Sequence, residues 1–265
     1  MNTMTQKQFK YIYGPVHSWR LGMSLGIDPL SQKGKVCNFD CLYCQLGRTA
    51  RFSAQRQAFV PTQAVLEEIQ SLPPLPIDYY TFSGRGEPTL AQNLGEMIQA
   101  VRAQTKGRIA VITNAALINQ REVREDLSSA DFVLAKLDAW DQSSFTDVDI
   151  PAEGIRLRDI VEGIKSFKRL FTGRLALQIM FIEQNKAHAR EIAQIAREIN
   201  PDEIQINTPL RPSAARPLGK EDLTLIKACF EGLPAVSVYE AERKMVEPWD
   251  ARQTLRRHGN SRKRG

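Results

Sequence analysis

The sequence predicts a single α/β domain with a mostly parallel sheet of about six strands. Two observations support this class. Short apolar runs alternate along the chain with stretches of helical spacing, and the unit recurs roughly every 25 to 40 residues, which is typical of βα repeats. The runs are apolar almost throughout, as expected for parallel strands covered by helices. No low-complexity linker divides the 265 residues.

The first strand is expected at 24–30, where "SLGIDPL" precedes a group of cysteines. Five further runs are predicted as buried strands because apolar residues fill them almost without interruption. They lie at 79–84, 108–117, 131–139, 174–182 and 203–210.

The stretches between the strands predict five helices, at 61–72, 90–104, 119–128, 158–171 and 186–199. Pro61 stands near the start of the first helix, where the N–H that proline lacks is not needed. Asn119 is expected to cap the third helix, and Asn200 with Pro201 to end the fifth.

Polar clusters follow five of the six predicted strands, at the point where each strand ends. They are the cysteines after the first strand, "SGRGEPTL" after the second, "TN" after the third, "KLDA" after the fourth and "NTPLRP" after the sixth. Parallel strands bring their carboxyl ends to one edge, where ligands bind in such folds. The clusters therefore predict one shared site.

The net charge of +6 comes from the end of the chain. The sequence has 36 Lys and Arg against 30 Asp and Glu, and no acid follows Asp250. The bases beyond that point are Arg252, Arg256, Arg257, Arg262, Lys263 and Arg264. A basic tail of this kind suits contact with RNA phosphates. The alternative interpretation is a frayed, solvated terminus.

The N-terminus has no apolar core of a signal peptide, and no run approaches the roughly 18 apolar residues of a membrane span. We therefore expect a cytoplasmic protein with no membrane partner. Thiols stay reduced in that compartment, so clustered cysteines indicate metal or redox chemistry rather than disulfides.

Three of the four cysteines follow the spacing CxxxCxxC in "CNFDCLYC". Zinc usually takes four ligands. The remaining candidates are Cys229, His17, His188 and His258, none with paired ligand spacing, and a zinc module would use Cys229 or His17. A ferredoxin-type redox carrier also needs a fourth cysteine for each cluster. A [4Fe–4S] cluster held by three thiolates explains the missing ligand, because its fourth iron is left for a small molecule. A zinc module and a redox carrier remain open alternatives at this point.

CxxxCxxC with an aromatic residue, Tyr43, before the last cysteine resembles the signature of the radical S-adenosylmethionine (SAM) superfamily. The segments "YGPVHSWRLGMSLGID", "CNFDCLYCQLGRT", "TFSGRGEPTL", "VITNAALI", "LAKLDA" and "IQINTPLRP" also resemble, in this order, a stand-alone family related to the tRNA-modifying wybutosine-biosynthesis enzymes. The resemblance covers residues 11 to about 217. It implies a partial (βα)6 TIM-like barrel at 1–240, with the cluster loop at 35–47, and a C-terminal extension with a basic tail at 241–265.

The resemblance also implies the chemistry. Cys37, Cys41 and Cys44 would bind a [4Fe–4S] cluster, whose open iron chelates SAM. A flavodoxin- or ferredoxin-type electron donor would supply the electron that splits SAM into methionine and a 5′-deoxyadenosyl radical, which abstracts hydrogen from a substrate. The chain would thus be an iron–sulfur oxidoreductase- or transferase-type enzyme, with RNA as the first substrate candidate. Val36, Phe39 and Leu42 would help to bury the cluster.

The residues expected to bind SAM come from the polar strand ends. Tyr43 would contact the adenine, and Gly84 and Gly86 would let backbone carbonyls approach the SAM ammonium group. Glu87 would add negative charge or brace the loop. The SAM-binding candidates are Tyr43, Gly84, Gly86, Glu87, Pro88, Asn114, Asp138, Gln178 and Asn207.

Lys136, Arg211 and Arg85 are the candidates for contact with substrate. Lys136 faces the same side of its strand as Asp138, where it would meet an anionic substrate or form a structural salt bridge. The inward polar residues have an alternative interpretation as satisfied polar groups of the core.

Three positions depart from the family pattern. Trp19 stands where an arginine is common, Arg85 where a small residue is common, and Ala115 where a glycine follows "TN". The small helical, DNA-binding-like module that often follows the barrel is expected to be truncated or absent. These differences fall where a substrate would bind, so we expect a substrate that differs from those of relatives.

Overall fold

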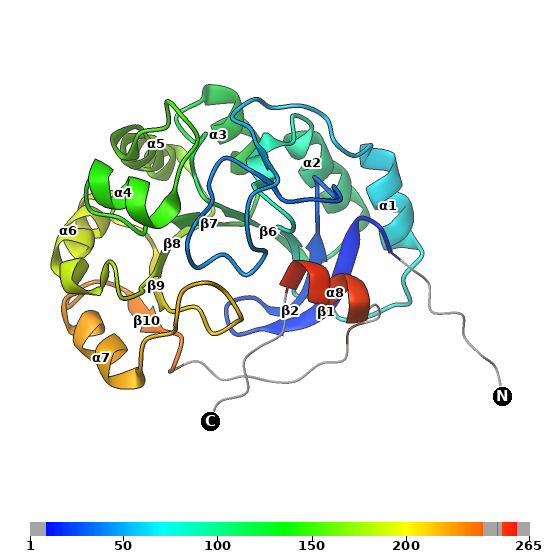
Figure 1. The fold of residues 1–265 in the computed structure, drawn as a ribbon. Helices are drawn as coiled ribbons and strands as arrows, with labels where there is room; N and C mark the ends of the chain where they lie inside the picture. The colour runs from blue at the N-terminus through cyan, green and yellow to red at the C-terminus, as the bar shows by residue number, and fades with distance from the viewer. Residues whose placement is uncertain (1–8, 241–247, 249–250, 259–265) are drawn as a thin grey trace.

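The computed structural model describes residues 9–240, 248 and 251–258, and its centre is an eight-stranded sheet. The strand order is β1-β2-β5-β6-β7-β8-β9-β10, and every neighbouring pair from β2 onward is parallel. The strands are β1 (Ile12–Ser18), β2 (Gly22–Ile27), β5 (Tyr79–Phe82), β6 (Arg108–Thr113), β7 (Phe132–Lys136), β8 (Arg174–Met180), β9 (Glu203–Asn207) and β10 (Ala235–Ser237). Figure 1 shows the curved sheet with helices around its outside, and the predicted partial-barrel class is confirmed.

The six predicted strands are present, and each ends earlier than the apolar pattern predicts. For example, β6 ends at Thr113 because Ala115 takes a left-handed conformation, with φ 61°, that turns the chain. Two strands of this sheet, β1 and β10, were not predicted. Gly14-Pro15 interrupts β1, which pairs antiparallel with β2, and β10 is too short to show a period.

The helices are α1 (Thr62–Gln70), α2 (Leu94–Gln104), α3 (Arg121–Ser128), α4 (Gln142–Asp149), α5 (Leu157–Leu170), α6 (Ala189–Ile199), α7 (Lys220–Ala228) and α8 (Ala251–His258). The five predicted helices correspond to α1, α2, α3, α5 and α6. The predicted cap at Asn119 is wrong, because a turn carries the chain to Gln120 before α3 begins, and Gln120 makes no side-chain cap bond. The short helix α4, with a capping box of Asp141 and Ser144, was not predicted.

The two faces of the sheet differ in chemistry. The outer face packs on the helices through aliphatic residues such as Ile109 and Val111. The inner face holds a separate apolar cluster near the amino ends of the strands, namely Leu21, Tyr79, Ala110, Phe132, Leu134 and Ala176. Side chains alternate along a strand, so the next inward positions are Lys136 and Gln178, which are paired in register. Apolar residues therefore close one end of the barrel, and polar residues gather at the other.

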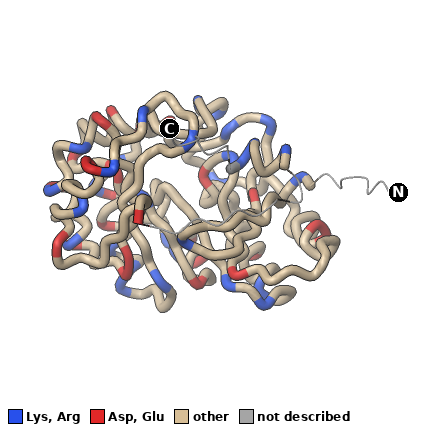
Figure 2. The backbone as a smooth tube through the Cα atoms, turned by 90° about the horizontal axis from the view of Figure 1, so that it is seen from below, with Lys and Arg blue, Asp and Glu red and all other residues tan. Residues whose placement is uncertain are grey.

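Charged residues of both signs are interspersed along the chain (Figure 2). Within the described residues, no helix has the length and apolar character needed to cross a membrane. The interpretation of the basic tail as frayed and solvated is wrong for Arg257, which is 5% exposed in α8 because it pairs with a buried carboxylate. Arg262, Lys263 and Arg264 lie outside the described residues.

Candidate functional site

The cluster loop is held between two backbone partners. Its first residues form β3 (Val36–Cys37), which pairs with β4 (Arg51–Phe52) in a small parallel sheet. On the other side, the Val36 N–H donates to the Arg85 carbonyl at 3.1 Å, and the Glu87 N–H donates to the Val36 carbonyl at 3.2 Å. A Cβ at Gly86 would lie 1.7 Å from the Val36 oxygen, so this contact requires glycine. The cysteines and the "GRGEP" loop are thus joined directly.

Two backbone carbonyls of the "GRGEP" loop, which were expected to accept hydrogen bonds from the SAM ammonium group, accept hydrogen bonds from within the protein. The Arg85 carbonyl is bonded to Val36, and the Glu87 carbonyl accepts from the Leu90 N–H at 3.1 Å. Gly84, with φ 147°, packs on a buried carboxylate, because a Cβ there would lie 2.4 Å from Asp28 Cγ. Pro88 opens the short 3₁₀ helix η1 (Pro88–Leu90) that ends the loop.

Cys37, Cys41 and Cys44 are unpaired thiols around one ammonium group. Burial alone lowers the pKa of Lys35, but the charges of the three cysteines, with Cys44 first, outweigh it and raise that pKa overall. Burial raises the pKa of Cys37 to about 12, and the nearby Glu87 carboxylate adds to this effect. Burial also raises the pKa of Cys41. The buried thiols therefore need a strongly positive partner to ionise, which iron provides.

The arrangement fits an iron–sulfur cluster. The donor set is three free cysteines of one loop, with no fourth cysteine in that loop. Zinc usually takes four ligands, whereas three cysteines suffice for a [4Fe–4S] cluster that leaves one iron open. Val36 and Phe39, at 3% and 2% exposed, shield one side of the thiols, while Leu42 is only partly buried.

Glu87 braces the loop, which is one of its two expected roles. Its Oε1 accepts from the Thr89 N–H at 3.0 Å and from the Thr89 and Thr113 hydroxyls at 2.7 and 2.5 Å. Its Oε2 accepts from the Asn114 N–H at 2.7 Å. Burial raises the pKa of the Glu87 carboxyl, and these hydrogen bonds partly offset the rise. Glu87 therefore ties the ends of β5 and β6 together.

Asn114 lies against the cluster loop. Its Nδ2 donates to Asn38 Oδ1 at 2.5 Å and lies 3.7 Å from Cys37 Sγ, within reach of a weak N–H···S hydrogen bond. Its Oδ1 accepts from the Ala116 N–H at 3.0 Å. This side chain is thus placed to tune a cluster at Cys37, because hydrogen bonds to the sulfurs influence the cluster potential.

Tyr43 is fixed by two buried carboxyl groups. Its hydroxyl is bonded to Asp138 Oδ2 and lies 2.8 Å from Asp149 Oδ1. Burial raises the pKa of Asp149 to about 7, and the negative charge of Asp138 adds to the rise. The single hydroxyl proton cannot serve both carboxylates, so the trio is satisfied when one carboxyl retains its proton. Asp138 Oδ1 also accepts from the Met180 N–H at 2.5 Å, so both of its oxygens are engaged within the protein.

Lys136 joins this network as a structural ion pair. Its Nζ lies 3.4 Å from Asp138 Oδ2, 3.3 Å from Gln178 Oε1 and 4.6 Å from the centre of the Tyr43 ring. The structure therefore brings four predicted residues together: Tyr43, Lys136, Asp138 and Gln178. A small cavity, with about 10 Å³ accessible to water, has Lys136, Asp138, Asn114 and Asp149 in its lining.

The remaining predicted residues lie apart from this network. Asn207 is buried at the end of β9, where its Oδ1 accepts from the Thr208 N–H at 3.1 Å. Arg211 Nη1 donates to Gln45 Oε1 at 2.7 Å and so links the loop after β9 to the cluster loop. Arg85 Nη1 donates to the Gln32 carbonyl at 3.0 Å.

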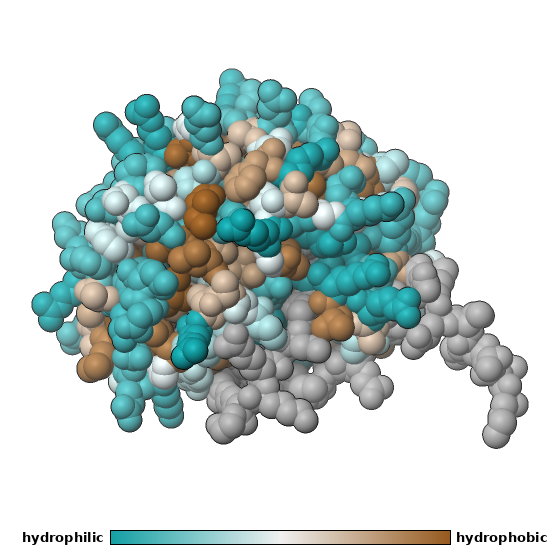
Figure 3. All heavy atoms as spheres, in the orientation of Figure 1, coloured by the Kyte–Doolittle hydropathy of each residue, from teal (hydrophilic) through white to brown (hydrophobic). Residues whose placement is uncertain are grey.

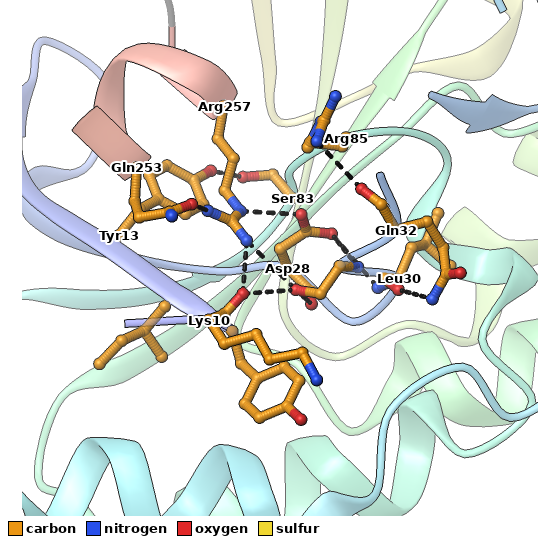
Figure 4. A network of polar contacts seen from close by, with 12 residues as sticks. Lys10, Tyr13, Asp28, Leu30, Gln32, Ser83, Arg85, Gln253 and Arg257 are labelled. Atoms are coloured by element: carbon orange, nitrogen blue, oxygen red, sulfur yellow. Dashed lines mark hydrogen bonds and ion pairs between the residues drawn. The ribbon is translucent and has the colours of Figure 1, made fainter. Parts of the chain in front are cut away.

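An ion pair at the end of β2 connects the C-terminal helix to the site (Figure 4). Arg257 Nε donates to Asp28 Oδ2 at 2.8 Å, and both side chains are almost fully buried. Arg257 also donates to the Lys10 carbonyl and to Gln253, and its backbone carbonyl accepts from Gln45 Nε2 at 3.3 Å. Helix α8 is thus fastened to the strand end beneath Gly84.

The sequence pattern missed several residues of this region: Asp28, Lys35, Asn38, Asp149 and Arg257. Lys35 and Asn38 lie within two residues of Cys37. Their closeness to a predicted cluster ligand could have identified them as site residues. Asp149 ends a helix that was not predicted. Asp28 and Arg257 are 229 residues apart, and no local pattern links them.

Comparisons with known proteins agree with this geometry. Residues 32–196 match the family model of the radical SAM superfamily. A UPF0026 protein of Synechocystis sp. is 41% identical over 214 residues, which cover 80% of this chain and 79% of the relative. The structure of Streptococcus suis SuiB bound to S-adenosylmethionine has a TM-score of 0.57 at 16% identity, covering 80% of this chain and 46% of that one.

Archaeal TYW1 has a TM-score of 0.55 at 15% identity, covering 82% of this chain and 74% of that one. The predicted resemblance to the radical SAM superfamily is confirmed, and its cofactors are a [4Fe–4S] cluster and SAM. The matched segment holds the three cysteines, the "GRGEP" loop and the Tyr43 network. By its sequence and its fold, this chain belongs to the radical SAM superfamily.

Proposed function

We propose that this chain cleaves SAM reductively and directs the resulting radical at a C–H bond of an RNA nucleoside. When bound, the cofactors supply one-electron cleavage of SAM to methionine and a 5′-deoxyadenosyl radical, which becomes 5′-deoxyadenosine by taking a hydrogen atom. The observation that carries the proposal is the direct backbone pairing of the three-cysteine loop with the "GRGEP" loop.

The chain's own residues have distinct parts in this function. Cys37, Cys41 and Cys44 would hold the cluster, and no fourth cysteine stands in the cluster loop. Val36 and Phe39 are buried beside these cysteines and would help to exclude water from the cluster. The bonds of Tyr43 to Asp138 and Asp149 fix the segment between Cys41 and Cys44, which would contact the nucleoside of SAM.

RNA is supported as the substrate by the basic residues near the barrel mouth. Arg252 and Arg256 are exposed on α8, the helix that Arg257 holds to the end of β2. Arginines at this edge suit phosphate groups, which take bidentate hydrogen bonds. Figure 3 shows apolar side chains in the middle of one face with hydrophilic side chains around them, a surface suited to an unstacked base.

The test of SAM cleavage uses anaerobically reconstituted protein with dithionite and SAM. We expect 5′-deoxyadenosine from the wild type, none from Cys41→Ala and an unchanged yield from Cys229→Ala. Cys229 is a matched control because it ends α7 and its thiol is bonded to the Leu225 carbonyl. A colourless zinc protein, or reduced protein that does not bind SAM, would overturn the proposal in favour of a zinc module or a redox carrier.

The test of the substrate compares a deletion strain with its parent by profiling RNA nucleosides, peptides and metabolites. We expect loss of one modified nucleoside, restored by the wild-type chain and not by Cys41→Ala. An unchanged nucleoside profile with an altered peptide or small metabolite would contradict RNA as the substrate and leave SAM cleavage intact.

A further inference from the structure

The segment that follows the cysteines carries positive charge. From Cys41 to Leu66 the chain has no Asp or Glu. The segment carries Arg48, Arg51 and Arg56. Arg48 and Arg51 are exposed, whereas Arg56 is occupied by the Thr89 and Ala91 carbonyls and Asp126. The two exposed arginines therefore present positive charge to solvent.

This positive segment lies directly beside a cluster ligand. In the two-stranded sheet, Phe52 is the register partner of Cys37, and the Ser53 N–H donates to the Cys37 carbonyl at 3.1 Å. Neighbouring strands are about 4.8 Å apart. Cys37 is 7% exposed while Phe52 is 46% exposed, so one strand spacing separates the buried ligand from an exposed aromatic ring.

Exposed basic residues lie before β3 and within β4, the strand that carries Phe52. Lys33 is exposed just before β3, and Arg51 is the register partner of Val36. The nearest acid in the sequence, Asp40, is held by Lys35 at 3.6 Å and by the Thr49 N–H at 2.6 Å. Lys33, Arg48, Arg51 and Phe52 thus form a patch with an apolar centre and a cationic rim, which we call the β4 patch. This composition is typical of a site for a transient, acidic protein partner.

We propose that the β4 patch is the docking surface for an acidic electron-donor protein, of the flavodoxin or ferredoxin class, that reduces the cluster through the Cys37 side. This inference rests on the proposed function, which consumes one electron for each SAM cleaved. The donor loses that electron from its reduced flavin or iron–sulfur centre, and the cluster gains it. The patch adjoins a cluster ligand rather than the strand ends that carry Lys136 and Gln178, which favours a donor over RNA as its occupant.

Reversing charge in the β4 patch should weaken binding of the electron donor. In Arg48→Glu/Arg51→Glu, the Kd for a reduced flavodoxin should rise by about tenfold or more, and its dependence on salt should weaken, because charge complementarity is reversed. The control is Arg121→Glu/Arg190→Glu, which reverses two exposed arginines on α3 and α6 and should leave the Kd unchanged. Calorimetry of the full chain, with and without the reconstituted cluster, measures binding independently of activity.

A second experiment distinguishes failure of the docking surface from failure of the proposed function. With flavodoxin as reductant, Arg48→Glu/Arg51→Glu should form 5′-deoxyadenosine several-fold more slowly at limiting donor, and with dithionite at the wild-type rate. Lys33→Glu should show a smaller loss of the same kind. If Arg48→Glu/Arg51→Glu and the wild type bind the donor with equal affinity, the β4 patch is not its docking surface. The same conclusion follows if the variant loses only RNA binding. If the wild type forms no 5′-deoxyadenosine with dithionite, the proposal that the chain cleaves SAM is overturned instead.

Discussion

Ala115 occupies a left-handed conformation, with φ 61°, directly after the "TN" that ends β6. Related sequences are expected to have glycine at this position, and the backbone explains why, since an L-residue costs about 1–2 kcal/mol there. The same turn places Asn114 against Cys37. The departure from glycine therefore stores strain beside Cys37, a predicted cluster ligand.

Replacing Ala115 with glycine removes this strain, and the stability gained should offset the stability lost with the buried methyl group. We predict that Ala115→Gly leaves the free energy of unfolding unchanged or slightly raised, while Ala116→Gly lowers it by about 1 kcal/mol or more. Both alanines are buried, and only Ala115 has a positive φ. Urea unfolding of the two variants measures the difference, and equal losses would show that the conformation carries no strain.

The contact of Asn114 with Cys37 Sγ should affect the cluster potential. An N–H···S bond favours the more negative, reduced cluster, so Asn114→Ala should lower the potential. We expect a shift of about 20–60 mV, equivalent to about 0.5–1.5 kcal/mol for a one-electron couple. Redox titration followed by EPR measures it, with Asn207→Ala as the control. A shift toward positive potential would contradict this role for Asn114.

At the scale of elements, the site depends on one contact between two loops. The "GRGEP" loop reaches the cluster loop through Gly86 and Val36, and Glu87 secures it to the end of β6. Neither loop has regular secondary structure of sufficient length to fix its own position. Their mutual pairing therefore sets where the cysteines stand relative to the strand ends.

A side chain at Gly86 should break this pairing. We predict that Gly86→Ala destabilises the protein by about 3 kcal/mol and reduces iron content after reconstitution, because the new Cβ overlaps a backbone oxygen. Gly154→Ala is the control, since Gly154 also has a positive φ but a Cβ added there would have no atom within 4 Å. Iron analysis and thermal unfolding test this, and similar losses in both variants would refute a special role for the contact.

The order of these elements could be predicted from the sequence better than their contacts. Apolar runs located six strands, and the "GRGEP" and cysteine motifs located the two loops, because both are local patterns. The bonds of Tyr43 to Asp138 and Asp149 were not predictable, since they join residues 95 and 106 positions apart. Helix α4 was missed because its signal is a capping box rather than a long apolar face.

At the scale of the molecule, α8 returns to the first strands and packs beside β1 (Figure 1). Thr254 Oγ1 accepts from the Gly14 N–H at 3.0 Å, and Arg257 pairs with Asp28. Removing one partner of a buried ion pair leaves an unpaired charge, which costs about 3–5 kcal/mol when the surroundings stay closed. The ion pair therefore couples the position of α8 to the strand end below Gly84.

This coupling predicts that Arg257→Met releases α8 from the barrel. We expect faster hydrogen exchange in 251–258 and near Asp28, with a loss of up to about 3–5 kcal/mol in stability. Arg256→Met, one residue earlier and exposed, should change neither quantity. Hydrogen exchange followed by mass spectrometry distinguishes them, and protection that persists in Arg257→Met would show that other contacts hold the helix.

In the proposed site, three cysteines hold the cluster and leave its fourth iron for SAM. The most direct measurement is electron–nuclear double resonance of the reduced, reconstituted protein with SAM labelled at its amino nitrogen. We expect a hyperfine coupling from that nitrogen, present in the wild type and in Cys229→Ala. A spectrum without this coupling, with a fourth side chain bound to the cluster, would contradict it.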